Sequence, residues 1–247
     1  MNEDFRKRAE AIIAAAPAVR SAVLIYSGGL DSTTLLHLLV RWGVSVRCMG
    51  VNYGQRHRTE LASAASSCLA AGVEFRIVDL HAAGFTPMLG GSSQTDPSVP
   101  VPDGHYADET MKKTVVPNRN MVMLSMAMSW AISTKSDAVA YAVHAGDHTI
   151  YPDCRPVFAD VMSAAGRLAD WHEVALLRPL IGATKADIAA VAGVLGVDVG
   201  GTWSCYRGGS VHCGQCGTCR ERREALQLSG VDDPTVYDSN VAAAEPA

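Results

Sequence analysis

Short apolar runs alternate with longer segments of helical periodicity along most of this chain. Runs of the strand type occupy residues 21–26, 44–53, 73–80, 138–143 and 174–177. Helical spacing of apolar residues follows them over residues 32–42, 56–71, 121–132, 158–168 and 184–195. Strands and helices that alternate in this way are joined by right-handed crossovers in a parallel sheet. We therefore predict an α/β fold, with a Rossmann-like parallel twisted sheet of about five strands flanked by helices.

Composition excludes several other classes of protein. Hydrophobic residues make up 48% of the 247 residues and charged residues 19%, whereas a disordered chain has low hydrophobicity and high charge. No run approaches the ~18 apolar residues that a membrane helix needs. The first eight residues mix acids and bases and precede no long apolar stretch, so we expect no secretory signal. These features predict a cytoplasmic protein that does not bind a membrane.

The negative charge is concentrated at the C-terminal end. Residues 231–247 contain four acidic residues and no Lys or Arg, while the rest of the chain has 21 acidic and 21 basic residues. A balanced body has no general basic surface for nucleic acid. We expect no direct nucleic-acid partner, and we expect residues 231–247 to form an acidic, flexible tail.

A glycine-rich loop joins the first strand to the first helix. Its sequence is Ser27-Gly28-Gly29-Leu30-Asp31-Ser32-Thr33-Thr34. The glycines allow a tight turn and a close approach to a ligand, and the helix that follows offers free N–H groups to an anion. It lacks the lysine of a mononucleotide-binding loop and the three-glycine spacing of a dinucleotide-binding loop. Residue content alone leaves two alternatives open, a phosphate site and a simple strand-to-helix turn.

Four of the seven cysteines lie within fifteen residues near the C-terminal end. They are Cys205, Cys213, Cys216 and Cys219. Four thiolates around one ion are typical of a structural zinc site, which has no open position for catalysis. An iron–sulfur run would need a further cysteine at position 223, which holds Arg223. We predict a structural Zn²⁺ held by the four cysteines, with His212 as a less favoured alternative to Cys205.

The whole string Ser-Gly-Gly-Leu-Asp-Ser resembles the pyrophosphate-binding loop (PP-loop) of the ATP pyrophosphatase family. Enzymes of this family cleave ATP between its α and β phosphates and adenylate an oxygen of the substrate. The resemblance implies that ATP is a substrate, that Asp31 lies near Mg²⁺, and that a longer set of residues contacts ATP. That set is Tyr26, Ser27, Gly28, Gly29, Leu30, Asp31, Ser32, Thr33, Thr34 and Arg56.

Further strings in the same order resemble the 7-cyano-7-deazaguanine synthase family over about residues 21 to 228. They run over residues 52–57, 116–120, 151–155, 178–180 with 184–185, and 202–206. Members of this family convert 7-carboxy-7-deazaguanine, ammonia and ATP into the nitrile, a precursor of queuosine. The resemblance implies a ligase with a small-molecule substrate, and it is compatible with a homodimer.

Residue roles follow from this resemblance. Asp31 is assigned a catalytic role near Mg²⁺. Arg119 and Lys185 are assigned catalytic roles because a guanidinium or ammonium neutralises phosphates or a substrate carboxylate, and the alternative for each is a solvated surface charge. Substrate contacts are assigned to Tyr151, Asp153 and Arg155. The Asp153 carboxylate pairs well with the N–H edge of a guanine-like ring, and the alternative is a cap at a helix entry.

The chain departs from the family pattern in two places. Asn118 stands where the family usually has glycine, and asparagine tolerates a left-handed φ better than most residues. Residues 145–150 replace a Cys-Glu-Thr-Asp-like stretch. Two competing functions remain open, another ATP pyrophosphatase-type enzyme acting on a nucleotide or tRNA, and a non-catalytic zinc-bearing module.

These observations also predict the domain organisation. Residues 1–200 form a PP-loop ATP-binding domain, residues 201–230 a four-cysteine zinc segment with a helix, and residues 231–247 the tail. The segment 81–118 is a long loop with five prolines. A loop of this length in a compact domain is usually either functional or disordered. Parallel sheets bind ligands at the carboxyl ends of their strands, so a functional loop here could cover a site at that edge.

Overall fold

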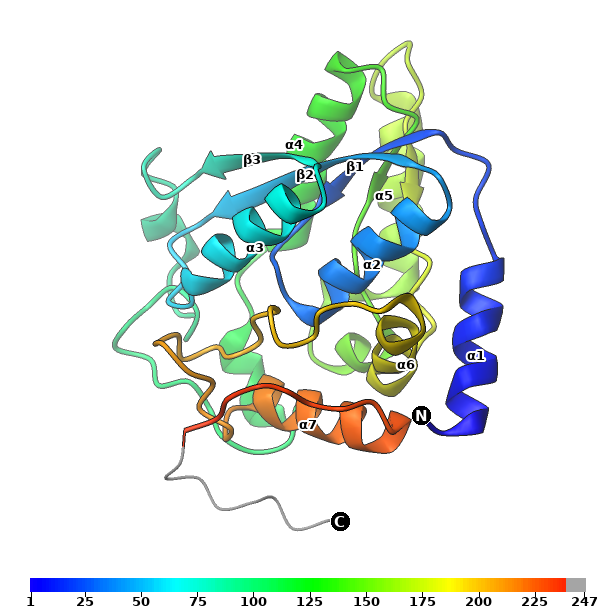
Figure 1. Ribbon diagram of the computed structural model, residues 1–247. Coiled ribbons are helices and arrows are strands. Elements are labelled where there is room, and N and C mark those ends of the chain that lie inside the picture. The colour runs from blue at the N-terminus through cyan, green and yellow to red at the C-terminus, as the bar shows by residue number, and fades with distance from the viewer. Residues whose placement is uncertain (239–247) are drawn as a thin grey trace.

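A five-stranded parallel sheet forms the middle layer of the computed structural model, which describes residues 1–238 (Figure 1). Across the sheet the strands are β3 (Glu74–Asp79), β2 (Ser45–Asn52), β1 (Ser21–Ile25), β4 (Ala138–Ala140) and β5 (Ala175–Leu177). All four neighbouring pairs are parallel. The predicted α/β fold with a five-stranded sheet is therefore confirmed.

Helices cover both faces of this sheet. They are α1 (Glu3–Ala14), α2 (Leu30–Arg41), α3 (Thr59–Ala70), α4 (Arg119–Ser133), α5 (Pro156–Leu168), α6 (Lys185–Leu195) and α7 (Gly217–Ser229). Figure 1 shows α2 and α3 on one face, with α4 and α5 behind the other. Helix α6 lies against α1, α2 and α7 at the side of the sheet.

The central strand β1 shows why the strand sequences read as unbroken apolar runs. Ala22 and Leu24 pack against the α2 side, whereas Val23 packs against the α4 side, and all three are fully buried. A strand covered on both faces needs apolar residues at every position. Each large side chain buried in this way contributes roughly 1.5–3 kcal/mol to stability.

Helix α1 is an addition that the apolar pattern did not predict. Its sequence is strongly charged, and Ala9 is the one buried residue of this helix. Ala9 packs with Ala190 and Val191 of α6. Phe5, Ile12 and Ile13 pack beside it partly buried, so the apolar stripe of α1 has helical spacing but is narrow among charged residues.

Local sequence determines how two of the helices start. The Thr184 hydroxyl accepts the Asp187 N–H, and the Asp187 carboxylate accepts the Thr184 N–H, which completes the capping box of α6. Asn118 precedes α4 with φ 56° and ψ 21°, which is the left-handed conformation expected of it.

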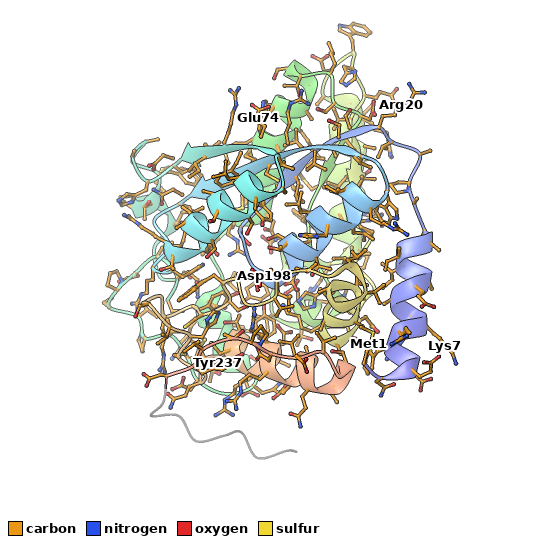
Figure 2. All side chains as sticks on the ribbon, in the orientation of Figure 1. Met1, Lys7, Arg20, Glu74, Asp198 and Tyr237 are labelled. Atoms are coloured by element: carbon orange, nitrogen blue, oxygen red, sulfur yellow. The ribbon has the colours of Figure 1, made fainter. Side chains whose placement is uncertain are left out.

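The C-terminal segment is tied to the body through a buried arginine on α7. Arg222 has no exposed surface, and its guanidinium donates to the Val199 carbonyl at 2.7 Å and to the Thr202 hydroxyl at 2.8 Å. It also donates to Thr235 at 3.0 Å, while the Tyr237 ring lies 5.9 Å from His212 (Figure 2). Residues 231–238 of the predicted tail therefore pack on the body, and residues 239–247 lie outside the described residues.

Two other expectations concern the surface and the long loop. Within residues 1–238, no helix combines the length and apolar character needed to cross a bilayer. The segment 81–118 contains two short 3₁₀ turns, at Thr86–Leu89 and Glu109–Thr114, and buries Ser92, Ser93 and Gln94. It is thus an ordered cover along one edge of the sheet.

The first testable prediction concerns Gly28, at the turn between β1 and α2. Gly28 has φ +80°, and a Cβ there would lie 2.7 Å from both the Ala64 nitrogen and the Glu60 oxygen of α3. We expect Gly28→Ala to lower the free energy of unfolding by about 2–3 kcal/mol, because it adds a backbone clash to left-handed strain. Urea unfolding measures this change.

Gly43→Ala is the matched control. Gly43 has φ +75° with open space around its Cα. An alanine at this position would be strained but would meet no clash, so we expect the free energy of unfolding to fall by about 1 kcal/mol. Equal losses in the two variants would contradict close packing of the loop against α3.

Candidate functional site

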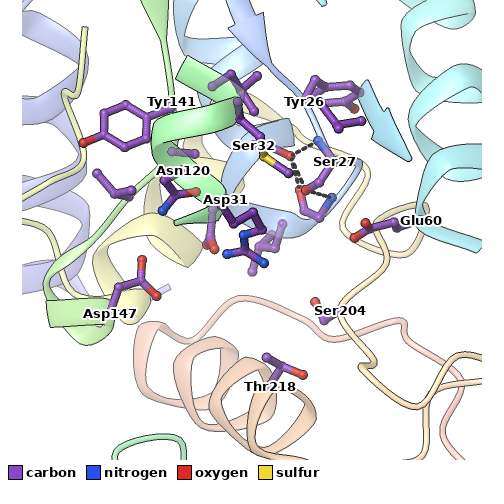
Figure 3. A pocket seen from close by; sticks show the side chains of 18 of the residues that line it. Tyr26, Ser27, Asp31, Ser32, Glu60, Asn120, Tyr141, Asp147, Ser204 and Thr218 are labelled. Carbon is purple, nitrogen blue, oxygen red and sulfur yellow. Dashed lines mark hydrogen bonds between the residues drawn. The ribbon is translucent and has the colours of Figure 1, made fainter. Parts of the chain in front are cut away.

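The candidate site lies at the carboxyl ends of the central strands. The strand order runs outward from β1 to β3 in one direction and from β4 to β5 in the other, so β1 and β4 form the switch point at which α/β sheets bind ligands. A cavity of about 210 Å³ opens there. Its walls come from the ends of β1, β2 and β4, the start of α4 and the C-terminal segment (Figure 3).

Serine hydroxyls hold the glycine-rich loop in its turn at the floor of this cavity. The Ser27 N–H donates to the Ser32 hydroxyl at 3.3 Å, and the two hydroxyls lie 3.2 Å apart. Gly29 precedes α2 and has no side chain to cap it. The first N–H groups of α2 therefore stay available to an anion, as a phosphate site requires.

The predicted ATP-contact residues of this loop divide into two groups. Six of them line the cavity: Tyr26, Ser27, Gly29, Leu30, Asp31 and Ser32. Gly28 packs against α3, Thr33 lies 3.1 Å from the Tyr26 hydroxyl, and the Thr34 hydroxyl donates to the Leu30 carbonyl at 2.7 Å. The last two threonines face the interior and fix the loop.

A buried lysine connects three helices at the cavity wall. The Lys185 ammonium, at the start of α6, donates to Asp31 of α2 at 2.6 Å and lies 3.3 Å from Glu221 of α7. Burial opposes its charge, but the two carboxylates raise the pKa of Lys185 above its ordinary value. The same contact outweighs burial at Asp31 and lowers the pKa of that carboxyl. The pair is therefore ionised at neutral pH.

Residues beyond the predicted set complete this cluster. His144 lies 3.8 Å from Asp31 and 3.5 Å from Asp147, and Asp147 also accepts the Tyr106 hydroxyl at 3.1 Å. Glu221 and Tyr106 were missed by sequence reasoning, because they come from α7 and from segment 81–118, which only the tertiary fold brings to the sheet edge. Glu60, which also lines the cavity, was missed for the same reason, whereas His57 lies in the family string over residues 52–57 and lines the cavity too.

Arg119 lies among aromatic side chains on the other side of the cavity. Its guanidinium donates to the Tyr53 hydroxyl at 3.3 Å and lies 5.8 Å from the centre of that ring. Within residues 1–238 no carboxylate forms an ion pair with it at 4 Å or less. Further aromatic residues of the cavity wall are Tyr106, Tyr141, Tyr151, Trp203 and Tyr206. An aromatic cavity with one unpaired cation suits a flat ring that carries an anionic group.

The other predicted contacts lie in different surroundings. The Arg56 guanidinium donates to the carbonyls of Asp96 and Val99, so it anchors segment 81–118 and does not line the cavity. Asp153 accepts the Asn120 N–H at 3.1 Å, which corresponds to the alternative of a cap at the entry of α4. Arg155 is exposed and donates to the His148 carbonyl.

Tyr151 alone of the three predicted substrate contacts lines the cavity. Its hydroxyl lies 2.6 Å from the Thr114 hydroxyl. The ring itself is buried at the cavity wall and lies 6.0 Å from the ring of Tyr106. Substrate contact through the face of Tyr151 is therefore compatible with its position.

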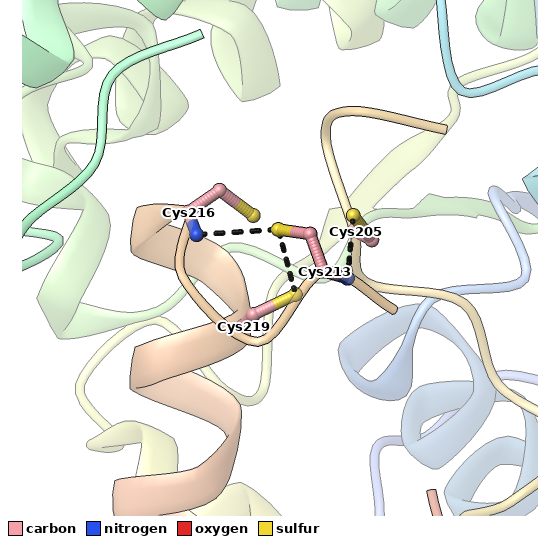
Figure 4. Close-up of side chains that lie close together, drawn as sticks. All are labelled: Cys205, Cys213, Cys216 and Cys219. Carbon is pink, nitrogen blue, oxygen red and sulfur yellow. Dashed lines mark hydrogen bonds between the residues drawn. The ribbon is translucent and has the colours of Figure 1, made fainter. Parts of the chain in front are cut away.

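The four predicted metal ligands come together beside α7 (Figure 4). All four sulfur atoms lie within 4.8 Å of one another, and those of Cys213 and Cys219 are 3.9 Å apart. Sulfurs bonded at ~2.3 Å to one tetrahedral ion would lie about 3.8 Å apart, so the set fits zinc. His212 is not part of the group, because its Nε2 accepts the Ser204 N–H at 3.0 Å.

This cysteine cluster adjoins the cavity directly. Trp203, Ser204, Tyr206 and Thr218 line the cavity and lie within or next to the stretch from Cys205 to Cys219. The Trp203 N–H donates to the Gly28 carbonyl at 3.0 Å, so the segment contacts the glycine-rich loop through the backbone. The segment that carries the four cysteines thus forms one wall of the site.

Known proteins resemble this chain over most of its length. The family described as "Queuosine biosynthesis protein QueC" matches residues 21–230. The 7-cyano-7-deazaguanine synthase of Hahella chejuensis is 47% identical over 88% of this chain and 93% of its own length. That of Rhizobium meliloti is 50% identical over 87% of this chain and 91% of its own.

Among solved structures, a glutamine-dependent NAD+ synthetase from Acinetobacter baumannii, in complex with ADP, has a similar fold. Its TM-score is 0.50 at 15% identity, and the match covers 77% of this chain and 33% of that chain. This likeness shows the fold alone and agrees with the predicted PP-loop type. From the match over residues 21–230 and the identities of the relatives, the chain belongs to the QueC family of 7-cyano-7-deazaguanine synthases.

Proposed function

We propose that this enzyme converts 7-carboxy-7-deazaguanine, ammonia and ATP into 7-cyano-7-deazaguanine through adenylated intermediates. The observation that carries the proposal is the combination of two features in one cavity. A phosphate-type loop lies at its floor, and an unpaired guanidinium lies in its aromatic wall. An acid and a nucleotide placed there would meet at the end of β1.

The chemistry requires that the acid be activated first. A carboxylate resists attack by ammonia, because its oxygen leaves poorly and its charge opposes the nucleophile. Transfer of AMP to that oxygen removes the charge and creates a leaving group, and ammonia then forms the amide. A second adenylation, on the amide oxygen, allows AMP to leave with formation of the C≡N bond.

The loop side of the cavity suits the phosphates of ATP. Ser27, Ser32 and the open start of α2 supply donors, and Lys185 supplies a positive charge. Asp31 would hold Mg²⁺, because its Oδ1 is buried in the cavity wall without a hydrogen-bond partner. The ion would offset the charge of the phosphates. By this assignment the protein contributes position and electrostatic stabilisation.

Arg119 suits the carboxylate of the acid better than the phosphates. It lies beside Tyr53 in the wall that Tyr151 and Tyr206 also line, whereas Lys185 lies beside Asp31 of the loop. A guanidinium can bind a carboxylate through two parallel hydrogen bonds, and the neighbouring rings can stack on the deazapurine.

Zinc has a structural role in this proposal. Four cysteines leave no open coordination position, so the ion would fix the wall that carries Trp203 and Tyr206. We also place the reaction in the cytoplasm, where thiols stay reduced and available to a metal.

Mass spectrometry of the products tests the proposed reaction. With ATP, ammonium and 7-carboxy-7-deazaguanine, we expect the nitrile together with two AMP and two pyrophosphate per nitrile. ATP–pyrophosphate exchange should require the acid. Exchange that ignores the acid would favour an enzyme with another substrate, and ADP with phosphate as products would contradict adenylation.

A second prediction concerns Arg119→Lys. Lysine keeps the charge but cannot bind a carboxylate through a planar pair of hydrogen bonds. We expect KM for the acid to rise about 10- to 100-fold while KM for ATP stays unchanged. Steady-state kinetics with each substrate varied in turn measures this split. A rise in KM for ATP alone would place Arg119 at the phosphates instead.

A third prediction concerns removal of zinc by a chelator. Structural zinc contributes roughly 10–16 kcal/mol in small zinc peptides, and the four predicted ligands all lie within residues 203–221. We expect these residues to lose hydrogen-exchange protection and ATP to bind more weakly, while β1 and β2 stay protected. Added zinc should restore both properties. Unchanged protection of residues 203–221 after verified metal loss would contradict this role.

A further inference from the structure

Glu60, in the first turn of α3, places a buried carboxyl at the cavity (Figure 3). Glu60 is 9% exposed. Its Oε1 accepts the Gln55 side-chain N–H at 3.0 Å, and its Oε2 lies 3.4 Å from Nε2 of His57. Within residues 1–238 no lysine or arginine pairs with this carboxyl at 4 Å or less. A buried acid without a cationic partner is costly, so a ligand is the natural source of positive charge.

His57 adds an unsatisfied acceptor next to this carboxyl. His57 is 4% exposed, and burial together with Arg119 lowers its pKa to about 3, so its ring is neutral. When Nε2 carries the proton and faces Glu60, Nδ1 presents a lone pair, and this atom has no partner among the described residues. The ring of Tyr206 lies 5.3 Å from that of His57.

The ligand that fits this corner is a small cation with several N–H donors. A guanine edge needs both carboxylate oxygens turned toward it, but Oε1 of Glu60 faces Gln55 and Oε2 faces His57. Ammonium needs one carboxylate oxygen, can donate to other acceptors, and is attracted by aromatic faces. A neutral acceptor and a carboxylate therefore favour ammonium over the ring of the substrate.

We propose that Glu60 and His57 form the ammonium site, and that Glu60 takes a proton from ammonium and so produces nucleophilic ammonia. This inference rests on the proposed function, because it assigns the nitrogen source of that reaction to a place in the cavity. It adds a catalytic residue to the ones already assigned.

The proton transfers balance as follows. Ammonium gives one proton to the Glu60 carboxylate and becomes ammonia. The nitrogen lone pair then forms the C–N bond to the adenylated carbonyl carbon, and the bond from that carbon to the AMP oxygen breaks with its electron pair. The proton that the nitrogen loses as the amide forms is taken by the phosphate of the departing AMP.

The surroundings of Glu60 set the pH at which it can act. Burial raises its pKa to about 7, while the Gln55 hydrogen bond and the charge of Arg119 from α4 oppose the rise. The other titratable groups around the pair are His57, Tyr53 after β2 and Tyr206 from the C-terminal segment, and all three are neutral near pH 7. The carboxyl is thus ionised above about pH 7 and can act as a base there.

Glu60→Gln tests the inference, because glutamine keeps the shape and removes the base. We expect kcat/KM for ammonium to fall about 100-fold or more. The wild-type rise of kcat/KM across about pH 7 should disappear in the variant. Hydroxylamine is already uncharged at neutral pH, so it should capture the adenylate as the hydroxamate at the wild-type rate. ATP–pyrophosphate exchange with the acid should also be unchanged.

Glu74→Gln is the matched control, since Glu74 lies on the edge strand β3 and pairs with Arg47 and Arg76 (Figure 2). It should match the wild type in every assay. Failure of the wild type itself to form hydroxamate would count against the proposed function. If the wild type forms it, unchanged ammonium kinetics in Glu60→Gln would overturn the ammonium site. Loss of exchange in Glu60→Gln would likewise overturn it, because that result places Glu60 at the ATP step.

Discussion

The ion pair between Lys185 and Asp31 determines how the site is assembled. It joins the start of α6 to the start of α2, and Glu221 extends the contact to α7. One ammonium therefore fixes three helices that are far apart in sequence. Breaking such a pair would leave a charge buried and uncompensated, which is costly. The pair therefore holds the three helix ends in fixed positions relative to one another.

This pair also explains the charge of the cavity. Asp31, Asp147 and Glu221 surround a single lysine, so the corner is rich in carboxylates before any nucleotide binds. Phosphates would add to this negative charge. A divalent cation beside Asp31 would reverse the balance, whereas Arg119 and the tyrosines around it are suited to the organic acid.

Sequence reasoning predicted the parts of the fold that depend on local pattern. The strand runs and the capping box at Thr184 were predictable, because burial on two faces and hydrogen bonding at a helix start leave direct marks in the sequence. The left-handed conformation of Asn118 was equally predictable, because asparagine tolerates a positive φ. Helix α1 was not predicted, since its apolar stripe of Phe5, Ala9, Ile12 and Ile13 is narrow and is flanked by charged residues.

The site was predictable only where a motif carried it. The cysteine spacing and the glycine-rich loop define their own geometry, so the cysteine side chains, like the serine side chains of the loop, lie together as expected. Glu60 reaches the cavity through packing of α3, and Glu221 reaches Lys185 through packing of α7, and no local pattern encodes either contact. Arg56 lies in a family string and was expected to contact ATP, but its guanidinium donates to two backbone carbonyls of segment 81–118 and anchors that loop.

The size of the cavity limits how substrates can enter. About 210 Å³ is less than the ~300–1,000 Å³ of pockets that hold drug-sized ligands, and the proposed reaction requires ATP and a bicyclic acid together. The strand ends are fixed by the sheet, and the four-cysteine segment is fixed by Arg222 and would be fixed further by a metal at its four sulfurs. Segment 81–118 brings Tyr106 to the cavity and is held by the other walls at three places. Arg56 donates to two of its carbonyls, Arg207 pairs with Asp103, and the Tyr151 hydroxyl lies 2.6 Å from that of Thr114. Widening the cavity on this side would break these polar contacts, which sets the cost of admitting both substrates.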